Sequence, residues 1–168
     1  MYDFYIKKKD FRWKVRLVAG GHLVNSTMFE SYSSMVKTKS LRLLQTIALN
    51  HGLKIITADI GNGFIQAFTK EKILTQCGNE FGDKIGPVVE IKKALYRLST
   101  NVQQWCLYLG DTLKVFCFVP SRADSDLWLI PSDDRTHYEY IATHADDLII
   151  VLSDPMNYIN KLKKTYPL

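Results

Sequence analysis

The residues of this chain with the most evident chemistry are the adjacent carboxylates Asp146 and Asp147. They lie between two apolar runs typical of β-strands, residues 140–143 and 148–152. Adjacent carboxylates repel each other, and placing ionised groups beside a buried strand costs several kcal/mol unless a partner compensates. Because a divalent metal ion is the usual partner, the pair predicts a metal site at the tip of a β-hairpin.

A second adjacent pair, Asp133 and Asp134, shows how little the dipeptide proves alone. With 12 Asp among 168 residues, roughly one Asp-Asp dipeptide is expected by chance. The second pair follows Pro131 and Ser132 and precedes Arg135, a context that predicts a solvated turn. The flanking sequence therefore has to distinguish the two pairs.

A third carboxylate, Asp59, ends an apolar run that begins at Leu53 and predicts a buried strand. If this strand and the strand 148–152 are neighbours in one sheet, three carboxylates converge at one end of it. Such a cluster can bind two divalent ions about 3.5–4 Å apart and support phosphoryl transfer. Mg²⁺ suits the oxygen ligands. The spacing leaves open whether the two strands are neighbours.

These residues need a sheet and helices to position them, and the hydrophobic pattern predicts both. We expect three helices, at residues 40–50 with Ser40 as N-cap and Gly52 as its stop, at 100–115, and from about Pro155 onward. We expect strands at 12–18, 53–59, 88–92, 127–130, 138–143 and 148–152, with a short strand near Ile73. Strands and helices that do not alternate strictly predict the α+β class.

The composition is that of a packed globular domain, with 46% hydrophobic and 23% charged residues. No apolar run approaches the roughly 20 residues of a membrane span, and the first residues lack the pattern of a signal peptide. We therefore expect a soluble, intracellular chain. Cys77, Cys106 and Cys117 have no metal-ligand or disulfide spacing and predict free thiols.

The net charge of +5 is concentrated in the first twenty residues, which contain six Lys or Arg and two Asp, a net +4. A basic surface of this density suits a polyanion such as nucleic acid. A solvated N-terminal strand explains the same charges equally well, so both alternatives stay open. Lys14 and Arg16 lie on the same side of the predicted strand, where two cations can face one ligand.

Short strings run in a fixed order along residues 6–160. They are KVRLVAGGH (14–22), YSSMV (32–36), SLRLL (40–44), DIGNGF (59–64), EKI (71–73), GNEFG (78–82), KALY (93–96), QW (104–105), ADSDLW (123–128) and YEYIATHADDLII (138–150). Each string is weak singly, but together and in this order they resemble the reverse transcriptase domain of Ty1/copia-type retrotransposons. The resemblance implies an RNA-dependent DNA polymerase.

The resemblance implies a right-hand polymerase with fingers and palm subdomains, the palm being a split βαβ antiparallel sheet with flanking helices. Residues 1–168 are then one reverse transcriptase domain fragment. About 1–52 belong mainly to the fingers and about 53–168 mainly to the palm, with an excursion into the fingers near 66–92. In the family, further palm, a thumb-like connection and ribonuclease H follow, and protease and integrase precede. We expect none of them here, so processive synthesis by this fragment is not expected.

For the site, the resemblance implies that Asp59, Asp146 and Asp147 are the catalytic and metal-binding residues. Asp59 matches the first catalytic aspartate of the family, and the pair matches the family's Tyr-x-Asp-Asp turn. Asp59 and Asp146 then bridge two Mg²⁺ ions, for which Mn²⁺ is a possible substitute, and Asp147 supports the site.

The resemblance also implies nucleotide-binding residues. Phe64 matches the aromatic position under the incoming sugar, where a ring clashes with a 2′-hydroxyl and selects deoxynucleotides; core packing is the alternative. Lys14 and Arg16 match the fingers region that contacts the triphosphate; a general basic surface is the alternative. The implied partners are an RNA or DNA template-primer, deoxynucleoside triphosphates and the rest of the Pol polyprotein. A cytoplasmic particle and the nucleus both stay open as location.

Four positions depart from the family pattern. His144 replaces Tyr, Ala145 replaces the usual Val or Met, Arg97 replaces Gly, and Gly63 replaces the usual Ala. None is a predicted metal ligand. Because these departures are typical of drift, two functional hypotheses stay open: a polymerase domain, or a non-catalytic nucleic-acid-binding relic of a retroelement.

Overall fold

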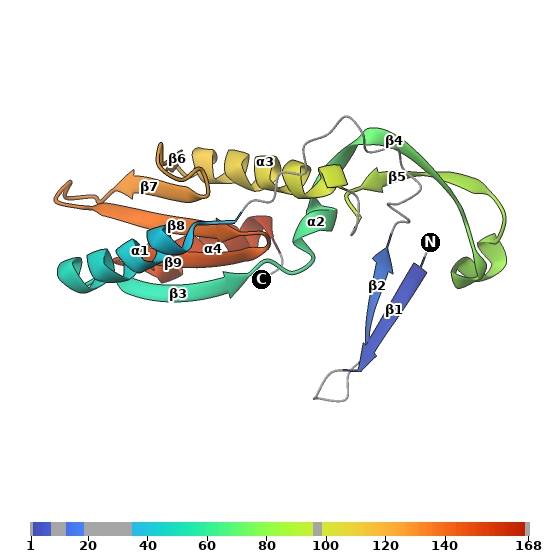
Figure 1. Cartoon of the computed structure of the whole chain (residues 1–168), viewed down its shortest axis with the longest axis horizontal. Coiled ribbons are helices and arrows are strands. Elements are labelled where there is room, and N and C mark those ends of the chain that lie inside the picture. The colour runs from blue at the N-terminus through green and yellow to red at the C-terminus, as the bar shows by residue number, and fades with distance from the viewer. Residues whose placement is uncertain (1, 8–12, 19–34, 96–98, 167–168) are drawn as a thin grey trace. The chain divides into compact units, whose positions relative to one another are not determined.

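The computed structural model describes residues 2–7, 13–18, 35–95 and 99–166 (Figure 1). The chain divides into two compact units. Unit 1 comprises residues 1–32 and 64–105, and unit 2 comprises residues 33–63 and 106–168. Both units combine segments from distant parts of the sequence, and each is described by itself below.

Unit 2 is built on an antiparallel sheet that contains five strands among the described residues, in the order β3-β9-β8-β7-β6. These are β3 (Lys54–Asp59), β9 (Asp147–Leu152), β8 (Tyr138–His144), β7 (Leu127–Pro131) and β6 (Val119–Pro120). The first strand in the chain order of this unit, β3, pairs with the last, β9. The pairing therefore joins residues almost a hundred positions apart.

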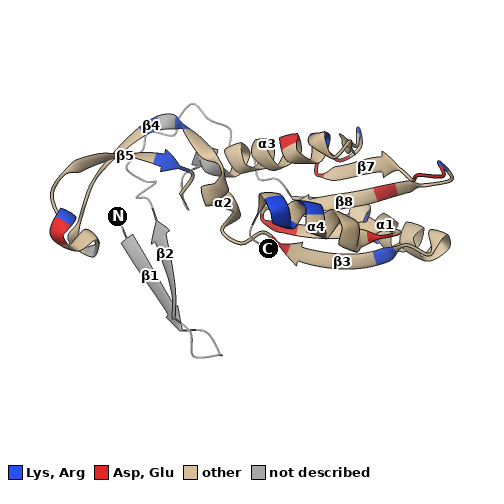
Figure 2. Cartoon of the chain, turned by 180° about the vertical axis from the view of Figure 1, so that it is seen from behind, with Lys and Arg blue, Asp and Glu red and all other residues tan. Residues whose placement is uncertain are grey.

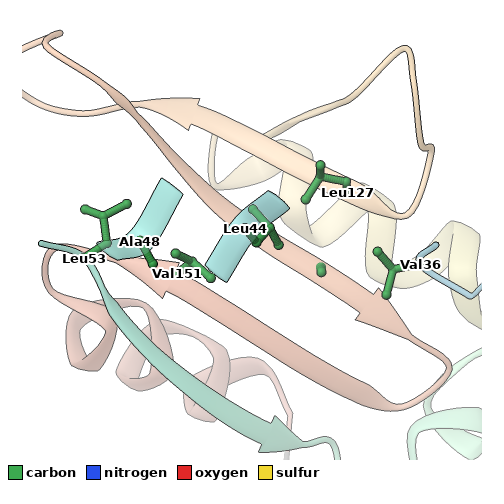
Figure 3. Close-up of a cluster of buried hydrophobic side chains, with 7 residues drawn as sticks. Val36, Leu44, Ala48, Leu53, Leu127 and Val151 are labelled. Atoms are coloured by element: carbon green, nitrogen blue, oxygen red, sulfur yellow. The ribbon is translucent and has the colours of Figure 1, made fainter. Parts of the chain in front are cut away.

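One face of the sheet is covered by helix α1 (Thr38–His51). A cluster of buried apolar side chains joins this helix to the strands (Figure 3), and its members are Val36, Leu44, Ala48, Leu53, Leu127, Ala142 and Val151. In α1 the buried residues Leu44 and Ala48 are four positions apart, so both lie on the face that meets the sheet.

The opposite face is covered by the second half of α3 (Ser99–Val115) and by α4 (Pro155–Thr165). A Cβ atom on Gly110 would lie 3.1 Å from the Trp128 ring, so the helix passes very close to β7. The ring of Phe118, just after α3, packs against the Tyr158 ring of α4. The hydroxyl group of Thr112 in α3 forms a hydrogen bond with that of Tyr166, the residue after α4. Helices on both faces explain why β9 is apolar without alternation.

The N-terminus of α1 differs from the prediction. The helix begins at Thr38 and its N-cap residue is Lys37, whose side chain makes no capping hydrogen bond to the helix. The prediction that Ser40 caps the helix is wrong, because its hydroxyl group donates to the carboxylate of Asp124 at 2.5 Å. The helix ends as predicted at Gly52, whose φ of 66° is the left-handed conformation that favours glycine.

Unit 1 contains two antiparallel strand pairs among the described residues. β1 (Tyr2–Lys7) pairs with β2 (Trp13–Val18), and β4 (Phe68–Gln76) pairs with β5 (Val88–Lys93). The short helix α2 (Gly63–Gln66) precedes β4, and the 3-10 helix η2 (Asn79–Lys84) connects β4 to β5. The short strand predicted near residue 73 is in fact nine residues long.

The α+β class is confirmed, and the predicted strands and the two later helices agree with the structure to within one or two residues at their ends. Most of residues 25–39 lie outside the described residues, and the last two of them belong to α1. Among the described helices, none has the length and apolar character needed to cross a membrane.

Candidate active site

Strand pairing brings the three predicted aspartates to one end of the sheet in unit 2. Asp59, the last residue of β3, lies directly opposite Asp147, the first residue of β9. Asp147 in turn lies opposite His144 at the end of β8, and Asp146 is in the turn that joins β8 to β9. The neighbouring strands that the prediction required are therefore present. Figure 2 shows acidic residues, in red, at the arrowhead end of β3.

The turn between β8 and β9 has two residues, Ala145 and Asp146, and the first adopts a left-handed backbone with a φ of 54°. Two-residue hairpin turns with this conformation at the first position favour glycine. An L-residue with a side chain costs roughly 1–2 kcal/mol there. The amide of Ile60 donates to the carbonyl of Asp146 at 2.9 Å, so the end of β3 holds the turn in place.

The three carboxylates have no protein partner in the described part of the chain. Asp59 and Asp147 are exposed and Asp146 is half-buried, and no hydrogen bond or ion pair among the described residues reaches their side-chain oxygens. Nor do any three or more His, Cys, Asp or Glu side chains of the described ranges converge closely enough to hold a metal ion. The backbone thus brings the aspartates to one end of the sheet, but the described side chains do not form a closed metal-binding group.

The donor set fits a hard divalent cation. All three groups are carboxylates, and oxygen ligands are those that Mg²⁺ and Mn²⁺ prefer. Residues directly opposite each other in an antiparallel pair have Cβ atoms about 4.5–5.5 Å apart and point to the same face of the sheet. Rotation of the side chains of Asp59 and Asp147 is therefore enough for both to reach one ion.

The segment before α1 lies against the end of β8. Met35 forms an antiparallel bridge with His144, and the amide of Val36 donates to the carbonyl of Thr143 at 3.2 Å. His144 is exposed and lies on the same face of the hairpin as Asp147. His144 is thus next to the aspartates and accessible to solvent.

The predicted nucleotide-binding residues belong to unit 1. Phe64 is half-buried in α2, and Lys14 and Arg16 lie in β2 opposite Ile6 and Phe4. Arg97 lies outside the described residues.

Sequence reasoning missed two buried carboxylates near the hairpin, Asp124 and Asp126. In the sequence they are part of the string ADSDLW (123–128). Asp124 accepts hydrogen bonds from the hydroxyl group of Ser40 and from the amides of Lys37 and Asp126. An Asp-x-Asp sequence just before an apolar strand is a weak signal for a turn that uses side-chain acceptors.

In unit 2 we therefore find an α+β domain whose sheet ends in a group of aspartates suited to divalent metal. A family model described as reverse transcriptase (RNA-dependent DNA polymerase) matches residues 2–167 of the chain. This chain belongs to the reverse transcriptase family, and its likeness to copia-type retrotransposon proteins, indicated by the sequence strings, is confirmed by its relatives.

The relatives are plant retrotransposon proteins. The chain is 28% identical over 155 residues to the retrovirus-related Pol polyprotein from transposon RE1 of Arabidopsis thaliana, covering 90% of this chain and 10% of the relative. It is 26% identical over 168 residues to the retrovirus-related Pol polyprotein from transposon TNT 1-94 of Nicotiana tabacum. This match covers 95% of this chain and 12% of the relative. The chain thus spans about a tenth of these relatives' length. No solved structure matches it.

Proposed function

We propose that this chain forms the fingers and palm of an RNA-dependent DNA polymerase, with Asp59, Asp146 and Asp147 as its metal-binding catalytic residues. The observation that carries the proposal is the register of β3 and β9, in which Asp59 lies opposite Asp147 at the hairpin tip. In a chain of the reverse transcriptase family, this arrangement of carboxylates supports nucleotidyl transfer.

In the proposed reaction, the 3′-hydroxyl group of a primer attacks the α-phosphate of a deoxynucleoside triphosphate, and pyrophosphate leaves. Two bound Mg²⁺ ions would supply Lewis acidity and in-line geometry. The protein's contribution is positional: the ends of β3 and β9 hold Asp59 and Asp147 on one face, and the Ile60 amide holds the turn that contains Asp146. Because these carboxylates are solvent-accessible, substrate phosphates have access to the ions they bind.

In this proposal unit 2 is the palm and unit 1 belongs to the fingers. The chain leaves unit 2 after residue 63 and returns after residue 105, which supports an excursion of the kind predicted near 66–92. Helix α1 packs on the sheet of unit 2, so we assign it to the palm. The boundary at about residue 52 that the sequence predicts places this helix mainly in the fingers.

We extend the proposal to substrate binding. Phe64 would contact the sugar of the incoming nucleotide, and Lys14 and Arg16 would contact its triphosphate. The template-primer would be RNA or DNA, in the setting of a Pol polyprotein like those of the relatives. The net charge of +4 in the first twenty residues supports contact with a polyanion.

Primer extension on an RNA template with Mg²⁺ or Mn²⁺ tests the proposal. We expect nucleotide incorporation by the native sequence and a loss of at least about a hundredfold in Asp146→Asn, because one carboxylate that stabilises the transition state is removed. Equal rates for the two proteins would contradict the assignment of the catalytic residues.

The second candidate is a non-catalytic nucleic-acid-binding module, which the basic N-terminal strands favour. If the native chain incorporates nothing but retards a primer-template duplex in a gel, and if this binding weakens steeply with salt, the second candidate is correct. If it neither extends nor binds the duplex, both candidates are wrong for this chain.

A further inference from the structure

A buried carboxylate outside the proposed catalytic site, Asp124, connects to both sides of the aspartate hairpin. Asp124 is 4% exposed to solvent and lies in the loop between β6 and β7. Burying a charge is costly unless hydrogen bonds satisfy it. Each of its two side-chain oxygens accepts hydrogen bonds from a different part of unit 2.

The first oxygen, Oδ2, holds the start of helix α1. It accepts hydrogen bonds from the Lys37 amide at 2.9 Å and from the Ser40 hydroxyl group at 2.5 Å. The first amides of a helix have no partner within the helix, and a negative charge is favourable there. Asp124 therefore serves as the N-terminal cap of α1 from more than 80 residues away.

The residues just before this cap touch the hairpin. Because Asp124 fixes Lys37, the preceding Val36 is held where its amide donates to the Thr143 carbonyl. Met35, one residue earlier, bridges His144. One side of the hairpin's base is thus attached to the capped end of α1.

The second oxygen, Oδ1, shapes the loop on the other side. It accepts a hydrogen bond from the Asp126 amide at 3.3 Å, and the Leu127 amide donates to the Asp124 carbonyl at 3.1 Å. The resulting tight turn presents the Asp126 carbonyl to Thr143. That carbonyl accepts hydrogen bonds from the Thr143 amide at 2.8 Å and from its hydroxyl group at 3.2 Å.

Both connections therefore meet at Thr143, which is three residues before Asp146 and lies opposite Leu148 across the hairpin. Burial raises the pKa of the Asp124 carboxyl group, but the hydrogen bonds from Ser40, Lys37 and Asp126 and the charge of Lys37 outweigh this, so its pKa lies below the ordinary value. The group is thus ionised at neutral pH and a strong acceptor for both connections.

We propose that Asp124 is a positioning residue for the catalytic hairpin: one carboxylate fixes the two segments that hold Thr143 and thereby sets the position of Asp146 and Asp147. The part of this inference that concerns catalysis, namely that the positioned aspartates bind metal ions, rests on the proposed function. The structural part, that Asp124 holds the hairpin, stands on the hydrogen bonds alone.

The test compares Asp124→Ala with Asp124→Asn and with Asp134→Ala, using the whole chain. Asp134 is a matched control because it also accepts three hydrogen bonds, at the opposite end of the sheet. Amide hydrogen exchange is measured without metal, and Mn²⁺ affinity is measured separately by calorimetric titration. The amides of Val36, Ile60 and Thr143 report on the hairpin, and the Ser132 amide, which donates to His137, reports on the far end.

In Asp124→Ala we expect exchange at the three hairpin amides to become about tenfold faster, the size of effect that follows from the loss of one helix cap. Exchange at Ser132 should stay unchanged and Mn²⁺ should bind about tenfold more weakly. Asp124→Asn keeps an acceptor for Lys37 and Ser40, so it should restore both quantities to within about threefold. The control should change exchange at Ser132 only.

Exchange that accelerates equally at all four amides would overturn the inference, since Asp124 would then contribute only to general stability. Unchanged Mn²⁺ affinity in Asp124→Ala would overturn the claim that Asp124 positions the aspartates for metal binding. If the native chain itself binds no Mn²⁺, the proposed metal site is wrong, and the exchange rates alone decide whether Asp124 holds the hairpin. Should Asp124→Ala fail to fold, Ser40→Ala removes one of the same hydrogen bonds and should give a smaller change at the same amides.

Discussion

The two ends of the sheet in unit 2 carry the same dipeptide in two different settings. At one end, Asp146 and Asp147 occupy the β8–β9 hairpin, and no protein group in the described residues binds their carboxylates. At the other end, Asp134 accepts hydrogen bonds from the Ser132 hydroxyl group at 2.6 Å and from the Thr136 amide at 3.0 Å. Figure 2 shows this second acidic group in the turn between β7 and β8.

The difference shows that the turn, and not the dipeptide, decides what a pair of aspartates does. The Asp134 carboxylate is satisfied by its own turn: hydrogen bonds from the Ser132 hydroxyl, the Thr136 amide and the Thr136 hydroxyl lower its pKa to about 2. The pair at the hairpin tip has no such partners and stays available to a ligand. A cavity of about 400 Å³ at the far end, lined by Asp133, Asp134 and Lys161 among others, adds no convergent metal site among the described residues.

The largest expected effect is on the rate of primer extension, which should depend on the aspartates at one end of the sheet and not on those at the other. Asp147→Asn should lower the initial rate of primer extension by at least about a hundredfold, because Asp147 lies opposite Asp59 at the proposed metal site. Asp134→Asn should leave the rate within about twofold, since its carboxylate acts only within its turn. A large loss of rate in Asp134→Asn would remove the contrast between the two ends.

The second prediction concerns how the free energy of unfolding changes at acidic pH. Because the pKa of Asp134 is about 2 in the folded chain and the ordinary value is 3.8, the folded chain binds this proton less readily than the unfolded chain. Its stabilising contribution is therefore present above about pH 4 and is lost as the pH falls toward 2. Urea unfolding at a series of pH values should show a shallower loss in Asp134→Asn. An unchanged slope would mean that the turn does not hold the carboxylate.

The smallest expected effect concerns strain, because each end has a turn residue with positive φ: Ala145 at 54° and Arg135 at 58°. Ala145→Gly and Arg135→Gly should each raise the free energy of unfolding by about 0.5–1 kcal/mol, since glycine adopts this backbone without steric cost. If strain at the tip serves catalysis, only Ala145→Gly should also change the rate of primer extension. Equal effects of both variants on the rate would contradict this.

Sequence reasoning predicted most of unit 2 because local signals and packing agree there. The apolar run after Asp147 forms a strand buried on both faces, and the short polar tip forms the hairpin. The pairing of β3 with β9 could not be predicted from the sequence, since no local signal specifies which distant strands become neighbours. The cap of α1 was misassigned for the same reason: Ser40 is a good capping residue by type, but the acceptor is Asp124.

In unit 1 the prediction was weaker for a different reason. The strand β4 contains charged residues at consecutive positions, including Lys70 and Lys72, and several of its side chains are exposed. A two-stranded pair with much solvent exposure lacks the apolar alternation from which a strand is predicted. Its length is set by pairing with β5, with a bulge between Phe68 and Ile73.

The most direct test of the central claim is calorimetric titration of the chain with Mn²⁺, which does not depend on activity. The native sequence should bind Mn²⁺ saturably. The double variant Asp146→Asn/Asp147→Asn should bind at least tenfold more weakly, because two hard oxygen ligands are neutralised. The double variant Asp133→Asn/Asp134→Asn should bind like the native sequence. Equal affinity in the first variant, or a comparable loss in the second, would contradict the account.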